Sequence, residues 1–298
     1  MSARPSLIVF GEVLFDHFPD GQSRLGGAPF NVAAHLQALG LNPLLLSRVG
    51  NDPQAQTIRK RMGQLGLSTM GLQQDSAHPT GMVEVSFVEG EPCYEIVHPA
   101  AYDFIAPDLF PAILEQGSEP RSEQDLLYHG SLAQRSEVSR EALQQLKSSF
   151  KGRIFFDVNL RAPWWSADAV LAEIQAAHWL KLNHHELEAL GLGDDDLQAA
   201  AESAIARFGL QGVIITQGEQ GALTVTATGE QAEVVPEPVD KVVDTVGAGD
   251  AFTSVMVAGL VNDWPLQETM QRAQRLASRI VGIRGALPES SELYQSVR

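Results

Sequence analysis

Short apolar runs alternate along the chain with longer amphipathic stretches. The apolar runs predict buried strands at residues 7–10, 44–49, 126–129, 154–158, 179–182 and 213–216. The stretches between them carry apolar residues at helical spacing and predict helices at residues 30–39, 53–65, 136–146, 167–177 and 197–208. Regular alternation of strands and helices is typical of a mainly parallel sheet with helices on both faces. The pattern therefore predicts the α/β class.

Three segments depart from this alternation. Residues 82–88 alternate strictly between apolar and polar side chains, and a short run follows at residues 94–97, which together predict a β-hairpin with one wet face. In an α/β protein we expect such a hairpin to form a flap at an edge of the sheet. Residues 222–227 and 233–235 predict a second hairpin, and the polar residues 115–124 predict a surface loop.

The composition is that of an ordinary globular enzyme, with 298 residues of which 44% are hydrophobic and 19% charged. The formal net charge of −16 disfavours binding to nucleic acids or anionic membranes, which needs clustered positive charge, so neither partner is expected. No apolar run approaches the roughly 20 residues of a membrane-spanning helix. Cys93 is the single cysteine, which fits a reducing, cytoplasmic compartment.

The segment Asp244-Thr245-Val246-Gly247-Ala248-Gly249-Asp250 carries the most specific chemistry. Apolar residues at helical spacing follow it, so its glycines lie at the start of a buried helix, where backbone N–H groups and the helix dipole attract an anion. Such a site stabilises a transferring phosphoryl group without basic side chains. Asp250 lies at the same helix start and can accept a proton from an attacking hydroxyl. The alternative is that the glycines only allow close packing and that Asp250 only caps the helix.

This segment resembles the C-terminal signature of the ribokinase-like (PfkB) sugar kinases, Asp-Thr-x-Gly-Ala-Gly-Asp. In that family the last aspartate is the catalytic base and the Gly-Ala-Gly backbone forms the anion hole. The resemblance implies these roles for Asp250 and for Gly247, Ala248 and Gly249. It also implies a single ribokinase-like, three-layer domain over residues 1–298, with lid elements at about residues 12–25 and 80–103.

Matches near the N-terminus extend the resemblance. Gly26-Gly27-Ala28-Pro29-Phe30-Asn31 fits the family's first signature, Gly-Gly-x-x-x-Asn, and its Ala-Pro centre looks more like fructokinases than like ribokinase. Asp16 follows the first strand, at the carboxyl edge where α/β proteins bind ligands. In this family an aspartate at this place contacts the sugar. The resemblance therefore implies that Asp16, Gly26, Gly27 and Asn31 bind the substrate.

Two further matches lie in the middle of the chain. Asp157-Val158-Asn159-Leu160-Arg161 fits the family's Asp-x-Asn-x-Arg and implies that Arg161 contacts the substrate; the alternative is an ion pair between Arg161 and Asp157. Asn183 and Glu186 fit Asn-x-x-Glu, which implies that Asn183 places the nucleotide and that Glu186 holds Mg²⁺ through water. The adjacent pair His184-His185 has poor geometry for zinc.

A third match concerns the nucleotide. Thr216-Gln217-Gly218-Glu219-Gln220-Gly221 resembles the family's nucleotide loop, Thr-x-Gly-x-x-Gly, so we expect Thr216, Gly218 and Gly221 to bind ATP together with Thr245. Many kinases of this type also bind K⁺ beside the anion hole. Asp244 and the stretch Arg284-Gly285-Ala286 are the candidates for such a site.

Together these features predict an ATP-dependent sugar kinase that uses Mg²⁺, with K⁺ as a candidate activator. Fructose is the favoured acceptor, and 2-keto-3-deoxygluconate, a nucleoside and a phosphosugar are the alternatives. Residues 80–103 contain no Lys or Arg, which disfavours a phosphosugar unless a partner subunit supplies cations. A non-catalytic sensor is more remote because Asp250 is present, and a dehydrogenase is disfavoured because no Gly-x-Gly-x-x-Gly follows the first strand. The sequence also allows a homodimer.

Overall fold

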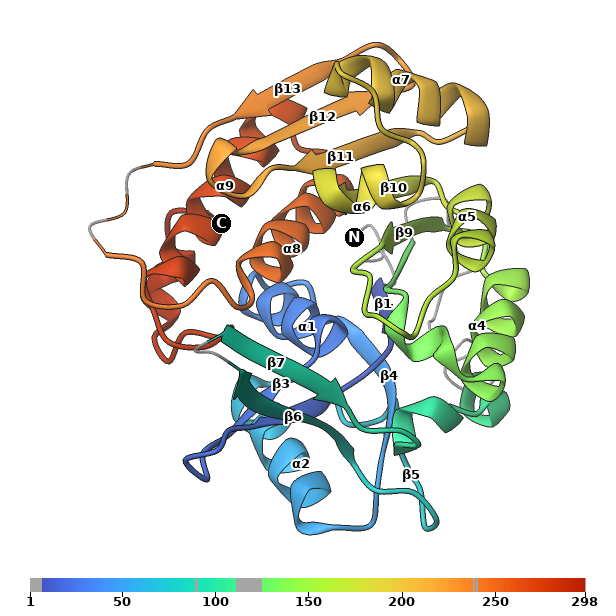
Figure 1. Ribbon diagram of the computed structural model, residues 1–298, viewed down its shortest axis with the longest axis vertical. Helices are drawn as coiled ribbons and strands as arrows, with labels where there is room; N and C mark the ends of the chain where they lie inside the picture. The colour runs from blue at the N-terminus through green and yellow to red at the C-terminus, as the bar shows by residue number, and fades with distance from the viewer. Residues whose placement is uncertain (1–6, 89–90, 111–124, 238, 240, 298) are drawn as a thin grey trace, which may run out of the picture.

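The computed structural model describes residues 7–88, 91–110, 125–237, 239 and 241–297 (Figure 1). The surface loop predicted at residues 115–124 lies outside these ranges. The centre of the molecule is a nine-stranded sheet. In order across the sheet, its strands are β13 (Gln231–Val234), β12 (Ala222–Thr226), β11 (Gly212–Thr216), β10 (Trp179–Asn183), β9 (Arg153–Asp157), β8 (Leu126–His129), β1 (Leu7–Phe10), β4 (Leu44–Val49) and β5 (Leu72–Gln74).

The sheet is mainly parallel. Within it, the β11–β12 and β12–β13 pairs are antiparallel, and the other neighbours pair in parallel. The six predicted buried strands are all present as β1, β4, β8, β9, β10 and β11, with ends shifted by at most one residue. Because these strands run the same way, their carboxyl ends share one edge of the sheet, which is where α/β proteins bind ligands.

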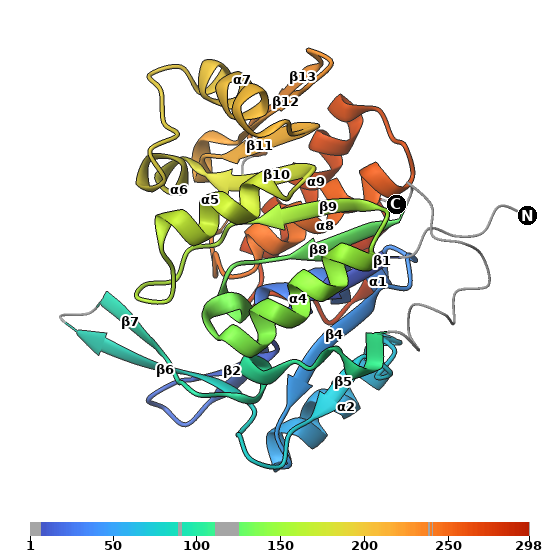
Figure 2. The same ribbon diagram turned by 90° about the vertical axis from the view of Figure 1, so that its right-hand side faces the viewer.

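Helices cover both faces of this sheet and make a three-layer architecture (Figures 1 and 2). Side chains of adjacent residues in β1 point to opposite faces, so Leu7 and Val9 enter one apolar core and Ile8 and Phe10 the other. The first core is closed by α1 (Ala28–Ala38), α2 (Pro53–Leu65), α8 (Ala248–Val261) and α9 (Leu266–Val281). The second is closed by α4 (Glu137–Ser149), α5 (Ala167–Gln175), α6 (His184–Ala189) and α7 (Leu197–Phe208).

A second, four-stranded sheet lies at one edge of the molecule and has the order β3 (Ser23–Gly26), β2 (Leu14–His17), β6 (Gly81–Val88) and β7 (Glu91–Ile96). The hairpin predicted from residues 82–97 is present as β6 and β7, and Figure 2 shows it projecting from the body. In β6 the residues Val83 and Val85 are buried whereas Glu84 and Ser86 are exposed, as the alternation indicates. The second predicted hairpin is β12–β13. None of the described helices is long and apolar enough to cross a bilayer.

Candidate active site

Two motifs that are distant in the sequence meet where α1 and α8 begin. The Asn31 side chain, in the first turn of α1, donates from Nδ2 to Oδ2 of Asp250 over 2.8 Å. Asn31 is 4% exposed, and its Oδ1 has no hydrogen-bond partner among the described residues. A buried amide oxygen without a partner is costly in a folded protein. This site therefore has an acceptor that a ligand hydroxyl could satisfy.

Both helix starts require glycine for steric reasons. Gly27 precedes α1 with φ 103°, and a Cβ on it would lie 2.8 Å from the carbonyl oxygen of Glu12. Gly247 precedes α8 with φ 81°, and a Cβ on it would collide with Ala286. Positive φ and close backbone approach are both conditions that glycine meets without strain. At both helix starts the glycine is therefore required by close packing against another segment of the chain.

The environment of Asp250 suits a base that works near neutral pH. Asp250 is half-buried in the first turn of α8, and desolvation by this burial raises its pKa to about 6. The hydrogen bond from Asn31 opposes that rise, the charge of Asp157 adds to it, and the charges of Lys181 and Arg161 oppose it. A carboxylate with a raised pKa accepts a proton more readily than an ordinary aspartate.

Glu12 is a site residue that the sequence analysis missed. It lies two residues after the end of β1 and is 4% exposed, and its Oε2 has no hydrogen-bond partner among the described residues. Burial raises its pKa to about 7, and the nearby charge of Asp250 adds to the effect. The available signal was its position as an acidic residue two places after Phe10, at the carboxyl end of a strand; the same signal led to Asp16.

Asp16 lies on β2, an inner strand of the four-stranded sheet. Its Oδ2 would be 3.4 Å from a Cβ on Gly26, so Gly26 leaves space beside this carboxylate. Burial raises the pKa of Asp16, and the charge of Arg24 is the largest opposing influence. Gly26, Gly27 and Asn31 therefore run from the end of β3 into α1, and Asp16 lies beside them on the neighbouring strand β2.

Arg161 is exposed and lies on the same side of the molecule. Its guanidinium donates to the Leu160 carbonyl over 3.1 Å, and its charge influences the pKa values of Glu12, Asp16 and Asp250. The alternative of an ion pair with Asp157 is wrong, because Asp157 instead binds Lys181, its neighbour on the adjacent strand, over 2.8 Å.

Asn183 and Glu186 form a capping box at the start of α6. Asn183 Oδ1 accepts from the Glu186 amide, and Glu186 Oε2 accepts from the Asn183 amide, both over 2.9 Å. Glu186 Oε1 accepts from the Leu160 amide over 2.8 Å. Both carboxylate oxygens bind backbone amides, which fix the side chain in place, and a Mg²⁺ ion held through water fits this arrangement. In the described part of the chain, no group of three or more His, Cys, Asp and Glu side chains could hold a metal ion.

The predicted nucleotide residues lie at loops rather than in one cluster of contacts. Thr216 ends β11, and Gly218 begins the short helix η4 (Gly218–Gln220) with φ 59°. Gly221 has φ 100°, and a Cβ on it would collide with the Val234 carbonyl, so this glycine is also required by the fold. Thr245 is exposed in the loop before α8.

Asp244 joins the two segments proposed for a K⁺ site. Its Oδ2 accepts from the Gly285 amide over 3.1 Å, and its Oδ1 accepts from the Val246 amide over 3.1 Å. The same Oδ2 lies 3.3 Å from Nη1 of Arg24, which comes from β3 of the small sheet. The segments meet as expected, but a cation bound here would have to share Asp244 with Arg24.

Arg135 is a second residue that the sequence analysis missed. It belongs to η3 (Leu132–Arg135), and it binds both carboxylate oxygens of Asp103, over 2.7 and 2.8 Å, and the Val97 carbonyl over 2.8 Å. Its guanidinium also lies over the rings of Tyr102 and Trp164, at 4.9 and 4.7 Å from their centroids. Residues 80–103 contain no Lys or Arg. Arg135 comes from another part of the chain, and Asp103 already neutralises its charge.

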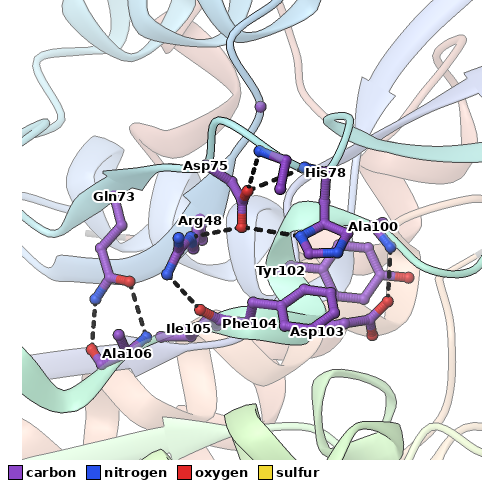
Figure 3. A network of polar contacts seen from close by, with 12 residues as sticks. Arg48, Gln73, Asp75, His78, Ala100, Tyr102, Asp103, Phe104, Ile105 and Ala106 are labelled. Carbon is purple, nitrogen blue, oxygen red and sulfur yellow. Dashed lines mark hydrogen bonds and ion pairs between the residues drawn. The ribbon is translucent and has the colours of Figure 1, made fainter.

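A neighbouring network holds the other end of the hairpin (Figure 3). Arg48 on β4 pairs with Asp75 over 2.9 Å and donates to the Phe104 carbonyl over 2.7 Å. His78 contacts Asp75 over 3.2 Å and stacks on Phe104 with 3.7 Å between ring centroids. These residues flank β6 and β7 in the sequence. The small sheet is therefore tied to the body on both sides of its hairpin.

The protein has a three-layer α/β body and a small four-stranded sheet at one edge, and a carboxylate lies at its glycine-rich helix start. This combination is that of a ribokinase-like kinase. The chain belongs to the pfkB family of carbohydrate kinases, whose family model matches residues 6–292. It is 31% identical to a fructokinase of Klebsiella pneumoniae over 97% of this chain and 98% of the relative. It is 28% identical to an aminoimidazole riboside kinase of Salmonella typhimurium (strain LT2) over 96% and 92% of the two chains.

Solved structures of the same two kinds of kinase resemble this chain over nearly its whole length. A fructokinase double mutant from Vibrio cholerae O395, with fructose, ADP and potassium ion bound, superposes with a TM-score of 0.81 at 26% identity over 100% of both chains. The aminoimidazole riboside kinase from Salmonella enterica, complexed with aminoimidazole riboside and an ATP analog, gives 0.80 at 25% identity over 98% of this chain and 100% of the other. The ribokinase-like fold expected from the sequence is confirmed.

Proposed function

We propose that this carbohydrate kinase transfers the γ-phosphoryl group of ATP to a hydroxyl of fructose. The observation that carries the proposal is the 2.8 Å hydrogen bond between Asn31 and Asp250, because it joins the two family signatures in one site. The Ala28-Pro29 pair and the full-length similarity to fructokinases support fructose as the acceptor. The product is fructose 6-phosphate or fructose 1-phosphate.

In this mechanism the sugar lies against Asp16, Gly26, Gly27 and Asn31, with Arg161 at the rim. Asp250 accepts the proton of the attacking hydroxyl as the new O–P bond forms, and the bond from the γ-phosphorus to the bridging oxygen of ADP breaks. The backbone amides at Gly247–Gly249 meet the charge on the transferring group. The small sheet acts as a lid that excludes water, so the sugar rather than water attacks.

The nucleotide is proposed to lie along Asn183, Thr216, Gly218, Gly221 and Thr245. Mg²⁺ bound with ATP would neutralise phosphate charge, and Glu186 would hold it through water because Mg²⁺ usually keeps several of its waters. K⁺ is proposed as an activator beside Asp244 and residues 284–286, which the Asp244–Gly285 hydrogen bond brings together.

We propose that residues 1–298 act as one kinase domain, with lid elements at about residues 12–25 and 80–103. Cys93 is the single cysteine, which supports a reducing, cytoplasmic location. No nucleic-acid or membrane partner is proposed, since the net charge is −16. A homodimer is compatible with this assignment.

The similarity to aminoimidazole riboside kinase supports a second candidate for the phosphoryl acceptor. The aminoimidazole riboside kinase aligns with nearly the whole chain and has the same fold. A nucleoside-like acceptor is therefore the leading alternative to fructose. 2-Keto-3-deoxygluconate is a further alternative, and a phosphosugar ranks lower because residues 80–103 contain no Lys or Arg to bind its phosphate.

The test is ADP release from Mg·ATP with fructose, aminoimidazole riboside, 2-keto-3-deoxygluconate and fructose 6-phosphate, each with and without K⁺. We expect the highest kcat/KM for fructose, and NMR of the product distinguishes phosphorylation at C1 from C6. Preference for the riboside would retain the kinase chemistry and replace the acceptor. Folded protein without ADP release on any of them would contradict the proposal.

A further inference from the structure

A buried ion pair lies beneath the start of α8. Lys181 on β10 and Asp157 on β9 are register partners on adjacent strands, and Lys181 Nζ donates to Asp157 Oδ1 over 2.8 Å. Their side chains are only 9% and 4% exposed. The pair is therefore shielded from water at the carboxyl edge of the sheet.

The second oxygen of Asp157 binds the helix above it. Asp157 Oδ2 accepts a hydrogen bond from Thr253 Oγ1 over 2.9 Å and a longer one from Tyr128 over 3.4 Å. Thr253 is fully buried and lies three residues after Asp250 on α8, so the two side chains are neighbours on the helix surface. A continuous chain of contacts thus runs from two strands of the sheet into the first turns of α8.

A contribution to the free energy of unfolding does not by itself explain the buried Asp157–Lys181 pair. Two charges removed from water carry a desolvation cost, and replacing a buried ion pair by apolar residues of similar volume is often neutral or stabilising. What apolar residues could not supply is an acceptor for Thr253 at a fixed place. The pair holds that acceptor rigidly, because Lys181 occupies Oδ1 and leaves Oδ2 facing the helix.

Asp250 is then held from two sides. Asn31 on α1 binds its carboxylate directly, and the Thr253–Asp157 contact holds the helix that carries it against the sheet. The two charges beneath also act in opposite directions on Asp250, since Asp157 raises its pKa and Lys181 lowers it. The pair can therefore anchor the helix without adding net charge beside the base.

We propose that Thr253, bound to the Asp157–Lys181 pair, is a positioning residue that sets the depth and direction of α8 and thereby aims Asp250 and the Gly247–Gly249 amides at the reacting groups. This inference rests on the proposed function. Thr253 touches neither substrate nor nucleotide in this role. Its effect is on the rate of transfer rather than on the affinity for ATP.

The first test compares Thr253→Val with Ser254→Ala. Both changes remove a buried hydroxyl from α8, but Ser254 Oγ donates only within the helix, to the Ala251 carbonyl over 2.7 Å. We expect Thr253→Val to lower kcat for fructose by at least about tenfold, because misplacement by about 1 Å can cost up to about 100-fold. The KM for ATP should change little, and Ser254→Ala should keep the wild-type kcat.

Thr253→Ser provides the rescue, because it keeps the hydroxyl and removes only a methyl group. We expect its kcat to lie close to that of the wild type. If Thr253→Ser is as slow as Thr253→Val, packing of the methyl group explains the loss and the positioning role is overturned. Equal losses in Thr253→Val and Ser254→Ala would also overturn it, since any buried hydroxyl of α8 would then be equivalent.

The second test removes the pair in the double variant Asp157→Leu/Lys181→Met. We expect a folded protein with a lower melting temperature, because Thr253 and Tyr128 lose their acceptor, and a kcat as low as that of Thr253→Val. Adding Thr253→Val to this variant should cause little further loss, because the two changes remove one interaction. A double variant with the wild-type kcat would overturn the inference.

The wild-type assay separates this inference from the proposed function. If the wild type phosphorylates fructose and Thr253→Val has the same kcat, only the positioning role is overturned. No turnover by folded wild-type protein on any acceptor overturns the proposed function and this inference with it.

Discussion

Arg24 on the small sheet and Asp244 at the start of the glycine motif form an ion pair with 3.3 Å between Nη1 and Oδ2. This pair connects the proposed lid directly to the proposed phosphoryl-transfer segment. The same Asp244 also accepts from the amides of Val246 and Gly285. A change at the lid can therefore reach the loop before α8 through a single carboxylate.

Arg24→Met should weaken the link between lid and motif. The pair is partly exposed, so we expect a loss of free energy of unfolding below about 1 kcal/mol. The expected effect is functional: a lower kcat with fructose and a larger share of ADP released without sugar, since a loose lid admits water. ADP release with and without fructose measures both.

Arg272→Met is the matched control for this variant. Arg272 forms a surface ion pair with Glu268 within α9 and does not contact the glycine motif. It should keep the wild-type ratio of sugar-dependent to sugar-independent ADP release. The same ratio in Arg24→Met and in the wild type would show that the Arg24–Asp244 pair does not couple the lid to the motif.

Asp250→Asn should abolish most turnover while preserving the fold. A general base contributes about 10²–10⁴-fold, so we expect kcat to fall by that amount. The amide keeps the shape of the side chain, and binding of ATP measured by calorimetry should be retained. Asp263→Asn, at a surface aspartate after α8, serves as the control. Normal turnover by well-folded Asp250→Asn would rule out Asp250 as the base.

The pH dependence of kcat/KM should report Asp250. Its pKa is raised to about 6, mainly by burial, and the base works only when deprotonated. Activity should therefore fall as the pH drops through about 6. Asn31→Leu removes a donor that stabilises the carboxylate, so the acid limb should move to higher pH in that variant. An acid limb that stays in place would show that Asn31 does not tune the base.

Glu12 should make the ligand-free protein less stable as the pH rises. Burial raises its pKa from 4.5 to about 7, so its contribution to the free energy of unfolding is fully present below about 4.5 and is lost by about 7. The difference is roughly 3 kcal/mol. Thermal unfolding at pH 5 and pH 8 should show a smaller decline for Glu12→Gln than for the wild type. Parallel declines would mean that Glu12 does not carry this pH dependence.

Local features of the fold were accessible from the sequence. The apolar period of each segment and its flanking glycines are properties of neighbouring residues, so β1, β4, α2 and α7 were predicted within one residue at each end. The hairpin β6–β7 was found for the same reason, since alternation marks a strand with one wet face. Some helix ends differ from the prediction, as in α4, which runs to Ser149 rather than to residue 146.

Site residues with a motif were found, and those without one were missed. Glu12 and Arg135 match no family signature, and their importance comes from burial and from partners such as Asp103. Asp157 was assigned the wrong alternative partner, because Arg161 is near in the sequence whereas Lys181 is near in space. The register of two parallel strands, separated by α5, places Lys181 beside Asp157.

The sequence by itself determined the class of fold, the family and the segment that carries the chemistry, because periodicity and short motifs are encoded by adjacent residues. Only the tertiary structure decided which of these segments meet. Asn31 and Asp250 are 219 positions apart, and Thr253 and Asp157 are 96 apart. Their contacts depend on how parallel strands and their helices stack around two apolar cores, which no local pattern specifies.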